Sequence, residues 1–388
     1  MNTAPLSIVR PAYDRTNAAI PLVDLKRQYQ PLKLEILQSL ENSLEELHLN
    51  GGPNVAAFEC EFASFVGADN AVAVGSGTEA LIMALKALGI GAGDEVITVS
   101  HTFAATAASV RMVGATPVFV DIDPVSYTMD CEALEEAISP RTRAVIAVHL
   151  YGQMAPMSHI TEIAQRHGLL VIEDACQAHG ATLYGRSAGT FGDAAAFSFY
   201  CSKNLGAYGE AGAVTTMRSD VAQKVRLLRD HGSEVRYKHE LVGTNSRMDE
   251  LQAAMLRIKL QYLAGWNRQR AAIARSYEER LADIDEIVLP RTILGGSHVF
   301  HLYVIRAPER DRLRRVLAKE EIATGIHYPV PLHLQPAFAD VRPRGRSLAV
   351  TECIAEEIVS LPMFPELRID EIDRICETIR LHYGKSPL

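Results

Sequence analysis

The chain has 388 residues, of which 48% are hydrophobic and 22% are charged, so it can bury a large core and is long enough for two domains. Its formal net charge of -8 excludes a general electrostatic attraction to nucleic acid or to an anionic membrane surface. The six cysteines are scattered, with no CxxC pair and no Cys/His cluster at zinc spacing, which predicts reduced thiols and no metal site. The first residues lack the apolar core of a signal peptide, and no later apolar run reaches the length of a membrane span. We therefore expect a cytoplasmic protein.

The first half of the chain alternates between strand-like and helix-like segments. Residues 1–20 mix Pro, Asn, Thr and Arg, which predicts a loose N-terminal arm, and helical spacing follows over residues 22–47. Short apolar runs separated by helix-like segments then occur at residues 71–74, 96–99, 117–121, 144–149 and 169–173. Such alternation predicts a mostly parallel sheet with helices on both of its faces.

The second half adds strands and then changes character. Two further runs at 195–198 and 212–216 bring the expected sheet to seven strands. Helical patterns cover 219–231 and 248–282, on either side of a polar segment at 232–247 that is too long for a tight turn. The rest reads as a smaller α+β unit, with a strand at 298–306 and helices at 309–319 and 370–383. We therefore predict an arm at 1–20, a helix at 21–50 that packs with the small domain, a large domain at 51–283 and a small C-terminal domain at 284–388.

The segment AVAVGSGTEAL, residues 71–81, predicts a strand, a glycine turn and the start of a helix. Ser76 and Glu79 fit a capping box, which is a sufficient structural reason for the pattern. The same helix start offers the free amides of Gly77 and Thr78 and the hydroxyl of Thr78, which suit a phosphate dianion. The residues also match the dinucleotide fingerprint GxGxxA, but no acidic residue ends the next strand, so dinucleotide binding is disfavoured.

Two other motifs follow predicted strands. In LLVIEDACQAHG, residues 169–180, Asp174 stands at the carboxyl end of a buried strand, the edge at which open α/β sheets bind ligands. A carboxylate there is either a helix cap or the partner of a protonated pyridine nitrogen in a cofactor ring, and Gln177 could orient the ring or the acid. In SHTFAAT, residues 100–106, Phe103 is either a core residue or a face on which a planar ring stacks.

Lys203 lies within FSFYCSKNLGAYGEAGAV, residues 197–214, among aromatic residues, small residues and glycines. One interpretation is a lysine on a surface loop. In the other, burial makes the amine easier to deprotonate, and a neutral amine can attack a carbonyl to form a Schiff base. Gly206, Gly209 and Gly212 permit close approach of the backbone, and Ser198 could add its hydroxyl to the phosphate site.

Five segments together resemble one family: GSGTEAL, EDACQAHGA, SFYCSKNLGAYGEAG, GTNSRMDELQAA and HYPVPLHLQPAF. They resemble the DegT/DnrJ/EryC1/StrS family of pyridoxal-phosphate-dependent nucleotide-sugar aminotransferases, over about residues 21–383. The resemblance implies an α/β protein of PLP-transferase fold type I, in which helices flank a mostly parallel seven-stranded sheet and a smaller α+β domain follows. It also implies pyridoxal 5'-phosphate (PLP) as cofactor, cycling through pyridoxamine 5'-phosphate.

The resemblance also assigns roles to residues. Lys203 would be the Schiff-base lysine and proton shuttle, Asp174 would pair with the pyridine nitrogen, and Gln177 would lie near the ring oxygen. Asn245 would reach the cofactor phosphate from the neighbouring subunit, which makes the active site shared and a homodimer obligatory. The remaining cofactor contacts would be Phe103 on the ring and Gly77, Thr78 and Ser198 on the phosphate.

Contacts to the substrate are less defined by the motifs. Tyr237, Lys238 and His239 lie in the region expected to meet the nucleotide diphosphate. His327 stands in a signature segment, as does His333, and packing within the small domain explains either residue equally well. The sequence departs from many members at residues 201–202, where Cys-Ser replaces Pro followed by Gly or Thr.

The function implied is a ping-pong transamination. L-Glutamate would give its amino group to the cofactor and leave as 2-oxoglutarate, and the amine would pass to a nucleotide-linked keto-sugar. The subtype resemblance favours C3 of a dTDP-linked 3-keto-6-deoxyhexose over C4 of a UDP- or dTDP-linked 4-keto sugar. Dehydratase relatives carry His where this chain has Lys203, which argues against that activity. A non-catalytic regulatory protein on the same scaffold is the alternative from another class, and neither a nucleic acid nor a membrane partner is expected.

Overall fold

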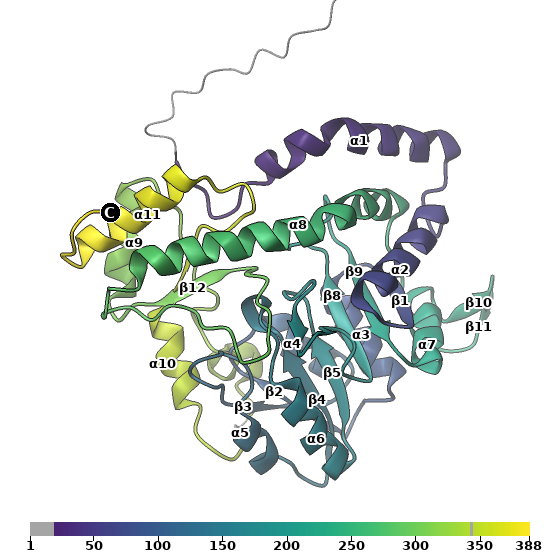
Figure 1. The fold of residues 1–388 in the computed structure, drawn as a ribbon. Coiled ribbons are helices and arrows are strands. Elements are labelled where there is room, and N and C mark those ends of the chain that lie inside the picture. Colours follow the sequence, from purple (N-terminus) through teal and green to yellow (C-terminus); the bar gives the residue numbers. More distant parts are fainter. Residues whose placement is uncertain (1–18, 342–343) are drawn as a thin grey trace, which may run out of the picture.

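The computed structural model describes residues 19–341 and 344–388 (Figure 1). Nearly all of the predicted N-terminal arm therefore lies outside the described residues. Ile20, at its end, is already fixed, because it forms a parallel β-bridge with Ile322. Within the described ranges, no helix is long and apolar enough to cross a membrane.

A seven-stranded sheet forms the centre of the molecule. Its strand order is β1-β9-β8-β5-β4-β2-β3, and every neighbouring pair from β8 to β3 is parallel, whereas β9 is antiparallel to both of its neighbours. The predicted mostly parallel seven-stranded sheet is thus confirmed, and the predicted runs agree closely with the strands. The strands are β1 (Asn70–Val74), β2 (Glu95–Val99), β3 (Thr116–Val120), β4 (Thr142–Val148), β5 (Leu170–Asp174), β8 (Ala194–Ser198) and β9 (Gly212–Thr216).

Helices cover both faces of this sheet, because both sets of alternating side chains on its strands are apolar. In β1, Ala71 and Ala73 belong to one buried cluster, while Val72 and Val74 belong to the cluster on the opposite face. The first face is covered by α2 (Pro53–Val66), α5 (Cys131–Glu136), α6 (Met157–His167) and part of α8 (Glu250–Leu281). The second face is covered by α3 (Gly77–Ala87), α4 (Ala104–Met112) and α7 (Ser219–Arg229).

Helix α8 extends from the C-terminal helices α9 (Arg310–Lys319) and α11 (Ile369–His382) to the region of α2 and β9 (Figure 1). Its first half packs on the sheet, and its second half contributes Ile273, Ala274, Tyr277 and Leu281 to a separate core in the C-terminal part of the chain. Helix α1 (Leu25–Glu46) lies beside its first half, where both helices supply apolar residues to one small cluster. The first turn of α1 meets the C-terminal part through an ion pair between Arg27 and Glu371.

The C-terminal segment is built on β12 (Tyr303–Arg306) and β13 (Ile358–Leu361), which pair in antiparallel fashion. Around them lie α9 (Arg310–Lys319), α10 (Ala349–Glu357) and α11 (Ile369–His382). The predicted strand at 298–306 was too long, because residues 298–302 form a loop that hydrogen-bonds to the sheet side of the molecule: Val299 N donates to Gly152 O at 2.9 Å. The division of the chain into domains stays a prediction.

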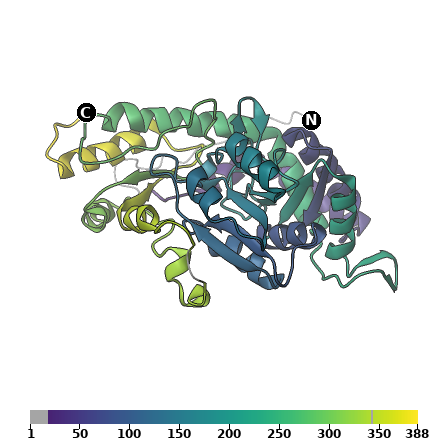
Figure 2. The same cartoon turned by 90° about the horizontal axis from the view of Figure 1, so that it is seen from below.

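The polar segment at 232–247 contains a hairpin of β10 (Ser233–Val235) and β11 (Lys238–His239). Both views show it extending away from the rest of the molecule, beyond α7 (Figures 1 and 2). Tyr237, in the turn between its strands, is 81% exposed and has a positive φ of 66°. The hairpin therefore makes few contacts with its own subunit.

Glu95, the first residue of β2, links three separate segments of the chain. Its buried carboxylate accepts hydrogen bonds from Ser139 Oγ at 2.6 Å, from the Arg141 guanidinium at 2.7 and 3.0 Å, and from Arg344. The hydrogen bonds from Arg344 are the main reason that the pKa of Glu95 falls to about 2, and those from Ser139 and Arg141 add to them against the opposing effect of burial.

Glu95→Gln should lower the free energy of unfolding at neutral pH by about 2 kcal/mol, because two guanidinium groups lose a charged acceptor. A carboxylate with a lowered pKa stabilises the fold above its unfolded pKa, so the difference from wild type should hold above about pH 5 and shrink as the pH falls toward 2. Urea unfolding over a pH series measures this difference. The control is Glu135→Gln, which removes an exposed ion pair with Arg166 and should change little. A difference that does not depend on pH would contradict the assignment.

Candidate active site

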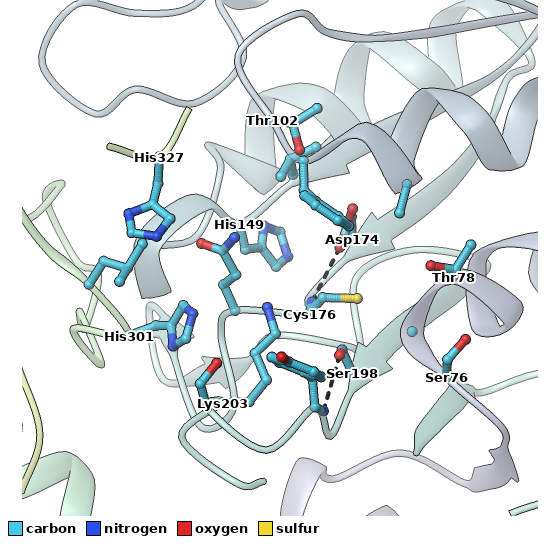
Figure 3. A pocket seen from close by; sticks show the side chains of 18 of the residues that line it. Ser76, Thr78, Thr102, His149, Asp174, Cys176, Ser198, Lys203, His301 and His327 are labelled. Carbon is cyan, nitrogen blue, oxygen red and sulfur yellow. Dashed lines mark hydrogen bonds between the residues drawn. The ribbon is translucent and has the colours of Figure 1, made fainter. Parts of the chain in front are cut away.

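The carboxyl ends of the parallel strands open into a cavity of about 640 Å³ (Figure 3). Its walls come from the turns after several strands, from the segment preceding α1, and from the loop before β12. Eight of the predicted site residues line this one cavity, although they come from five separate motifs of the sequence. They are Gly77, Thr78, Phe103, Asp174, Gln177, Ser198, Lys203 and His327.

One end of the cavity is the N-terminus of α3. Ser76 caps the helix as predicted, since its Oγ accepts from Glu79 N at 3.1 Å, but Glu79 Oε2 is buried without a hydrogen-bond partner. The amides of Gly77 and Thr78, in the first turn, have no intrahelical acceptor and border the cavity. A Cβ on Gly77 would lie 2.6 Å from Ser198 Cβ, so only glycine allows α3 to pack this closely on the end of β8.

Asp174 is the last residue of β5, as the sequence predicted, and its side chain is held from two sides. Thr106 Oγ1 donates to Asp174 Oδ2 at 2.8 Å, and the backbone N–H of Cys176 donates to Oδ1 at 3.3 Å. Its backbone O also accepts from His149 N at 3.0 Å, which fixes the ends of β4 and β5 relative to each other. The carboxylate is only slightly exposed and borders the cavity (Figure 3).

Gln177 is tied to a second set of groups. Its Oε1 accepts from Tyr151 N at 2.8 Å, and its Nε2 donates to the Tyr328 hydroxyl at 3.2 Å. The Tyr328 ring in turn lies beside Phe103, with ring centroids 5.7 Å apart and planes tilted by 43°. Phe103 remains 55% exposed, so one aromatic face borders the open volume of the cavity.

Lys203 follows β8 in a loop, where its backbone N–H donates to Tyr200 O at 2.8 Å and closes a turn. Its side chain points into the cavity (Figure 3). Burial lowers the pKa of the amine, although Cys176 and Asp174 partly oppose this shift. More of the neutral amine is therefore present near neutral pH than for a lysine in water, which is the form that attacks a carbonyl.

Two histidines beside Lys203 are held neutral. Burial, with a smaller effect of the Lys203 charge, lowers the pKa of His327 to about 4, and the same causes lower that of His301. His327 Nδ1 lies 2.8 Å from Ser360 Oγ, and His301 Nδ1 lies 3.3 Å from Asn204 Oδ1. Neither imidazole adds a positive charge to the cavity near neutral pH.

Four of the predicted contact residues lie outside the cavity of their own subunit. Asn245 is exposed and forms a β-bridge with Asp230, while Tyr237, Lys238 and His239 belong to the extended hairpin. None of the four lines the cavity of this chain. His333 also lies outside the cavity, where it contacts Ser100 Oγ at 2.7 Å and Glu352 at 3.0 Å, so packing explains it.

Other cavity residues were not predicted. Thr102, Cys176 and Tyr328 stand inside the motifs, directly beside predicted residues, so their positions alone could have indicated them. No local pattern could have indicated the residues that arrive from distant segments, because only the tertiary fold brings them to this edge of the sheet. These are Leu22, Val23, His149 and His301.

The residues present fit pyridoxal phosphate. The N-terminus of α3, with Thr78 and Ser198, offers amide and hydroxyl donors for a phosphate dianion. Asp174 supplies an acceptor for a protonated ring nitrogen, and the lowered pKa of Lys203 suits an amine that reacts with an aldehyde. Glycine at position 77 lets the N-terminus of α3 approach Ser198 closely, so the amide and hydroxyl donors lie side by side.

This sheet, with an aspartate ending β5, a helix N-terminus beside it and a lysine after β8, defines a pyridoxal-phosphate-dependent aminotransferase of fold type I. The model of the DegT/DnrJ/EryC1/StrS aminotransferase family matches residues 31–380, and the chain belongs to this family.

Similar proteins agree with this assignment. The chain is 45% identical over 361 residues to the dTDP-3-amino-3,4,6-trideoxy-alpha-D-glucose transaminase of Streptomyces venezuelae, covering 93% of this chain and 95% of the relative. It is 46% identical over 364 residues to the UDP-N-acetyl-3-dehydro-alpha-D-glucosamine 3-aminotransferase of Acidithiobacillus ferrooxidans, covering 94% and 98%. A third relative, 45% identical over 366 residues and covering 94% and 98%, is the pleiotropic regulatory protein of Geobacillus stearothermophilus.

A solved structure gives the same result at the level of the fold. The crystal structure of S. venezuelae DesV in complex with a ketimine intermediate superposes with a TM-score of 0.93 at 44% identity, and the match covers 96% of this chain and 100% of that one. Together, the family, the relatives and this structure identify the chain as a sugar aminotransferase.

Proposed function

We propose that the protein transfers the amino group of L-glutamate to C3 of a dTDP-linked 3-keto-6-deoxyhexose, with pyridoxal 5'-phosphate as the cofactor that cycles through pyridoxamine 5'-phosphate. The observation that carries the proposal is the joint placement of Lys203, Asp174 and the N-terminus of α3 in one cavity. When bound, the cofactor supplies a ring that accepts electrons from the carbon losing its proton. The choice of C3 is supported by the names of two relatives, both of which refer to the 3-position.

The side chains that line the cavity have different proposed roles. The free amine of Lys203 moves the proton between the substrate carbon and the cofactor, because its pKa is lowered and its side chain points into the cavity. Asp174 pairs with the ring nitrogen of the cofactor, and Gln177 lies near the ring oxygen. Phe103 stacks on one face of the ring. Gly77, Thr78 and Ser198 hold the phosphate.

The balance of charge in the cavity supports a homodimer with shared sites. Among the described residues that line it, Lys203 is the sole lysine or arginine, and Asp174 and Glu210 are carboxylates. The cofactor phosphate, glutamate and a nucleotide diphosphate are all anions, so one subunit leaves them poorly compensated. Asn245 and the hairpin that carries Lys238 and His239 are exposed on their own subunit and are proposed to complete the site of a neighbouring one.

A second candidate function is amination of a UDP-linked sugar, or amination at C4. The name of one relative supports UDP as the nucleotide. A regulatory role, suggested by the name of another relative, is disfavoured because Lys203 and Asp174 are both present in the cavity.

A substrate panel tests the proposal. The pyridoxamine-phosphate form of the protein is mixed with dTDP- and UDP-linked 3-keto and 4-keto sugars, and amino-sugar formation is scored by mass. We expect the dTDP-linked 3-keto-6-deoxyhexose to react fastest. A faster reaction with a UDP-linked or 4-keto sugar would replace the proposed substrate, and no reaction with any sugar would favour the regulatory role.

A further inference from the structure

The hydroxyl of Thr106 bonds to a group outside its own helix. In the interior of a helix, such a hydroxyl commonly bonds to a carbonyl one turn earlier in its own helix. Thr106, in the first turn of α4, instead donates across to Asp174 Oδ2 at 2.8 Å. Ser109, one turn later, shows the common arrangement, since its Oγ donates to Thr106 O at 2.8 Å. Both side chains are fully buried.

A second hydroxyl continues this chain toward the cavity. Thr102 Oγ1 lies 2.9 Å from Thr106 Oγ1, and Thr102 itself borders the cavity. A carboxylate can only accept hydrogen bonds, so the single hydroxyl proton of Thr106 is used on Asp174. The bond between the two threonines must therefore run from Thr102 to Thr106. The hydroxyl groups form a directed relay that ends on the carboxylate, and each bond polarises the next.

We propose that Thr106, supported by Thr102, is a positioning residue that fixes the orientation of the Asp174 carboxylate toward the ring nitrogen of the cofactor. The inference rests on the proposed function, because it presupposes that the ring nitrogen meets Asp174. Hydrogen bonds to a charged acceptor are about twice as strong as neutral ones, so a donor fixed in a helix limits the orientations open to the carboxylate.

The helix gives this contact a second consequence. Phe103 is the N-cap of α4, and Thr106 N donates to Phe103 O at 3.2 Å, so the proposed ring platform and the donor to Asp174 belong to one helical turn. The bond between Thr106 and Asp174 therefore fixes α4 against β5. This bond sets the position of the Phe103 ring relative to the Asp174 carboxylate.

A pair of cofactor analogues tests the inference without measuring turnover. The two ligands are pyridoxamine 5'-phosphate and its 1-deaza analogue, in which C–H replaces the ring nitrogen. The dissociation constant of the deaza analogue, divided by that of pyridoxamine 5'-phosphate, reports the interaction at that nitrogen. We expect Thr106→Val to reduce this ratio about tenfold, the lower end of the range of about 10- to 100-fold found when a partner that orients a metal ligand is removed. Thr106→Ser, which keeps the hydroxyl, should restore the wild-type ratio.

Two controls separate positioning from packing. Ser109→Ala removes a buried hydroxyl from the same helix and should leave the ratio unchanged. Thr102→Val, which removes the outer bond of the relay, should reduce the ratio by a smaller factor and carries the test if Thr106→Val does not fold. Equal weakening of both analogues by Thr106→Val, with an unchanged ratio, would overturn the inference. If the wild-type protein failed to prefer the natural cofactor, the proposed role of Asp174 would fail as well, so the two failures are distinguishable.

Discussion

Lys203→Ala should lower the rate of amine transfer from glutamate by about a thousandfold or more, because a positioned acid–base group contributes about 10²- to 10⁴-fold and no other amine lines the cavity among the described residues. The rate is measured in a single turnover with protein loaded with cofactor. The melting temperature should not fall. Burial lowers the pKa of Lys203, so the folded state holds its proton less tightly than the unfolded chain does, and the charged lysine lowers stability below the unfolded pKa.

Two further variants define the cause of this loss. Lys203→Arg keeps a cation that does not lose its proton near neutral pH, so it should be as inactive as Lys203→Ala. A small primary amine added to Lys203→Ala should restore part of the rate. Lys224→Ala, which changes an exposed lysine of α7, should behave as wild type. Activity of Lys203→Ala near the wild-type rate would end the proposed mechanism.

The same variant tests whether the site is shared. If Asn245 completes the neighbouring site, a dimer of one Lys203→Ala and one Asn245→Ala subunit has one site with both changes and one site with neither. Mixing the two variants under conditions of subunit exchange should then produce activity above that of either alone. If each subunit built its site by itself, no mixed dimer would contain an unaltered site, and activity would not rise on mixing.

Asp174→Asn should lower the rate of the glutamate half-reaction by about 10²- to 10³-fold, the effect of removing one group that stabilises charge in a transition state. An amide cannot neutralise a protonated ring nitrogen, so the ring should accept electrons less readily. Stopped-flow absorbance of the bound cofactor follows this step. Asp220→Asn, on the surface of α7, serves as the control. An unchanged rate in Asp174→Asn would remove the carboxylate from the mechanism.

The neighbouring carboxylate, Glu173, shows why two acidic residues in sequence differ in role. It is fully buried and accepts from His149 Nε2 at 2.9 Å and from the backbone N–H groups of Gly189, Phe191 and Gly192 at 2.7 to 2.8 Å. Burial raises the pKa of Glu173, but these donors outweigh it, and the net pKa is lowered. Glu173 therefore holds the backbone, whereas Asp174 borders the cavity.

The sequence was sufficient to predict the sheet and its ligand-binding edge, because both depend on local patterns. Buried strands in a parallel sheet are short, continuous apolar runs, and the motifs came directly after them. Asp174 and Phe103 could be placed at this edge for that reason. The resemblance to a family then gave roles to residues, such as Gln177, whose chemistry alone left alternatives open.

Features that depend on distant partners could not be predicted. The run HVFHLYVIR alternates as a strand does, yet only residues 303–306 pair with another strand, which is β13. Helix α10 begins where Asp121, at the end of β3, accepts from the backbone N–H groups of Val350 and Thr351 at 2.9 and 2.8 Å. The hydrogen bond of Thr106 to Asp174 likewise joins residues 68 positions apart. No local pattern records these contacts.

The length of α8 has a consequence for how the protein melts. Its 32 residues form a rod about 48 Å long that supplies side chains to the core beneath the sheet and to the C-terminal core. If one core unfolded alone, half of this helix would expose its apolar face to water. Unfolding of one core without the other is therefore unfavourable. Helix α8 thus couples these two cores, as do β12 and β13, which also supply side chains to both, and we expect them to unfold together.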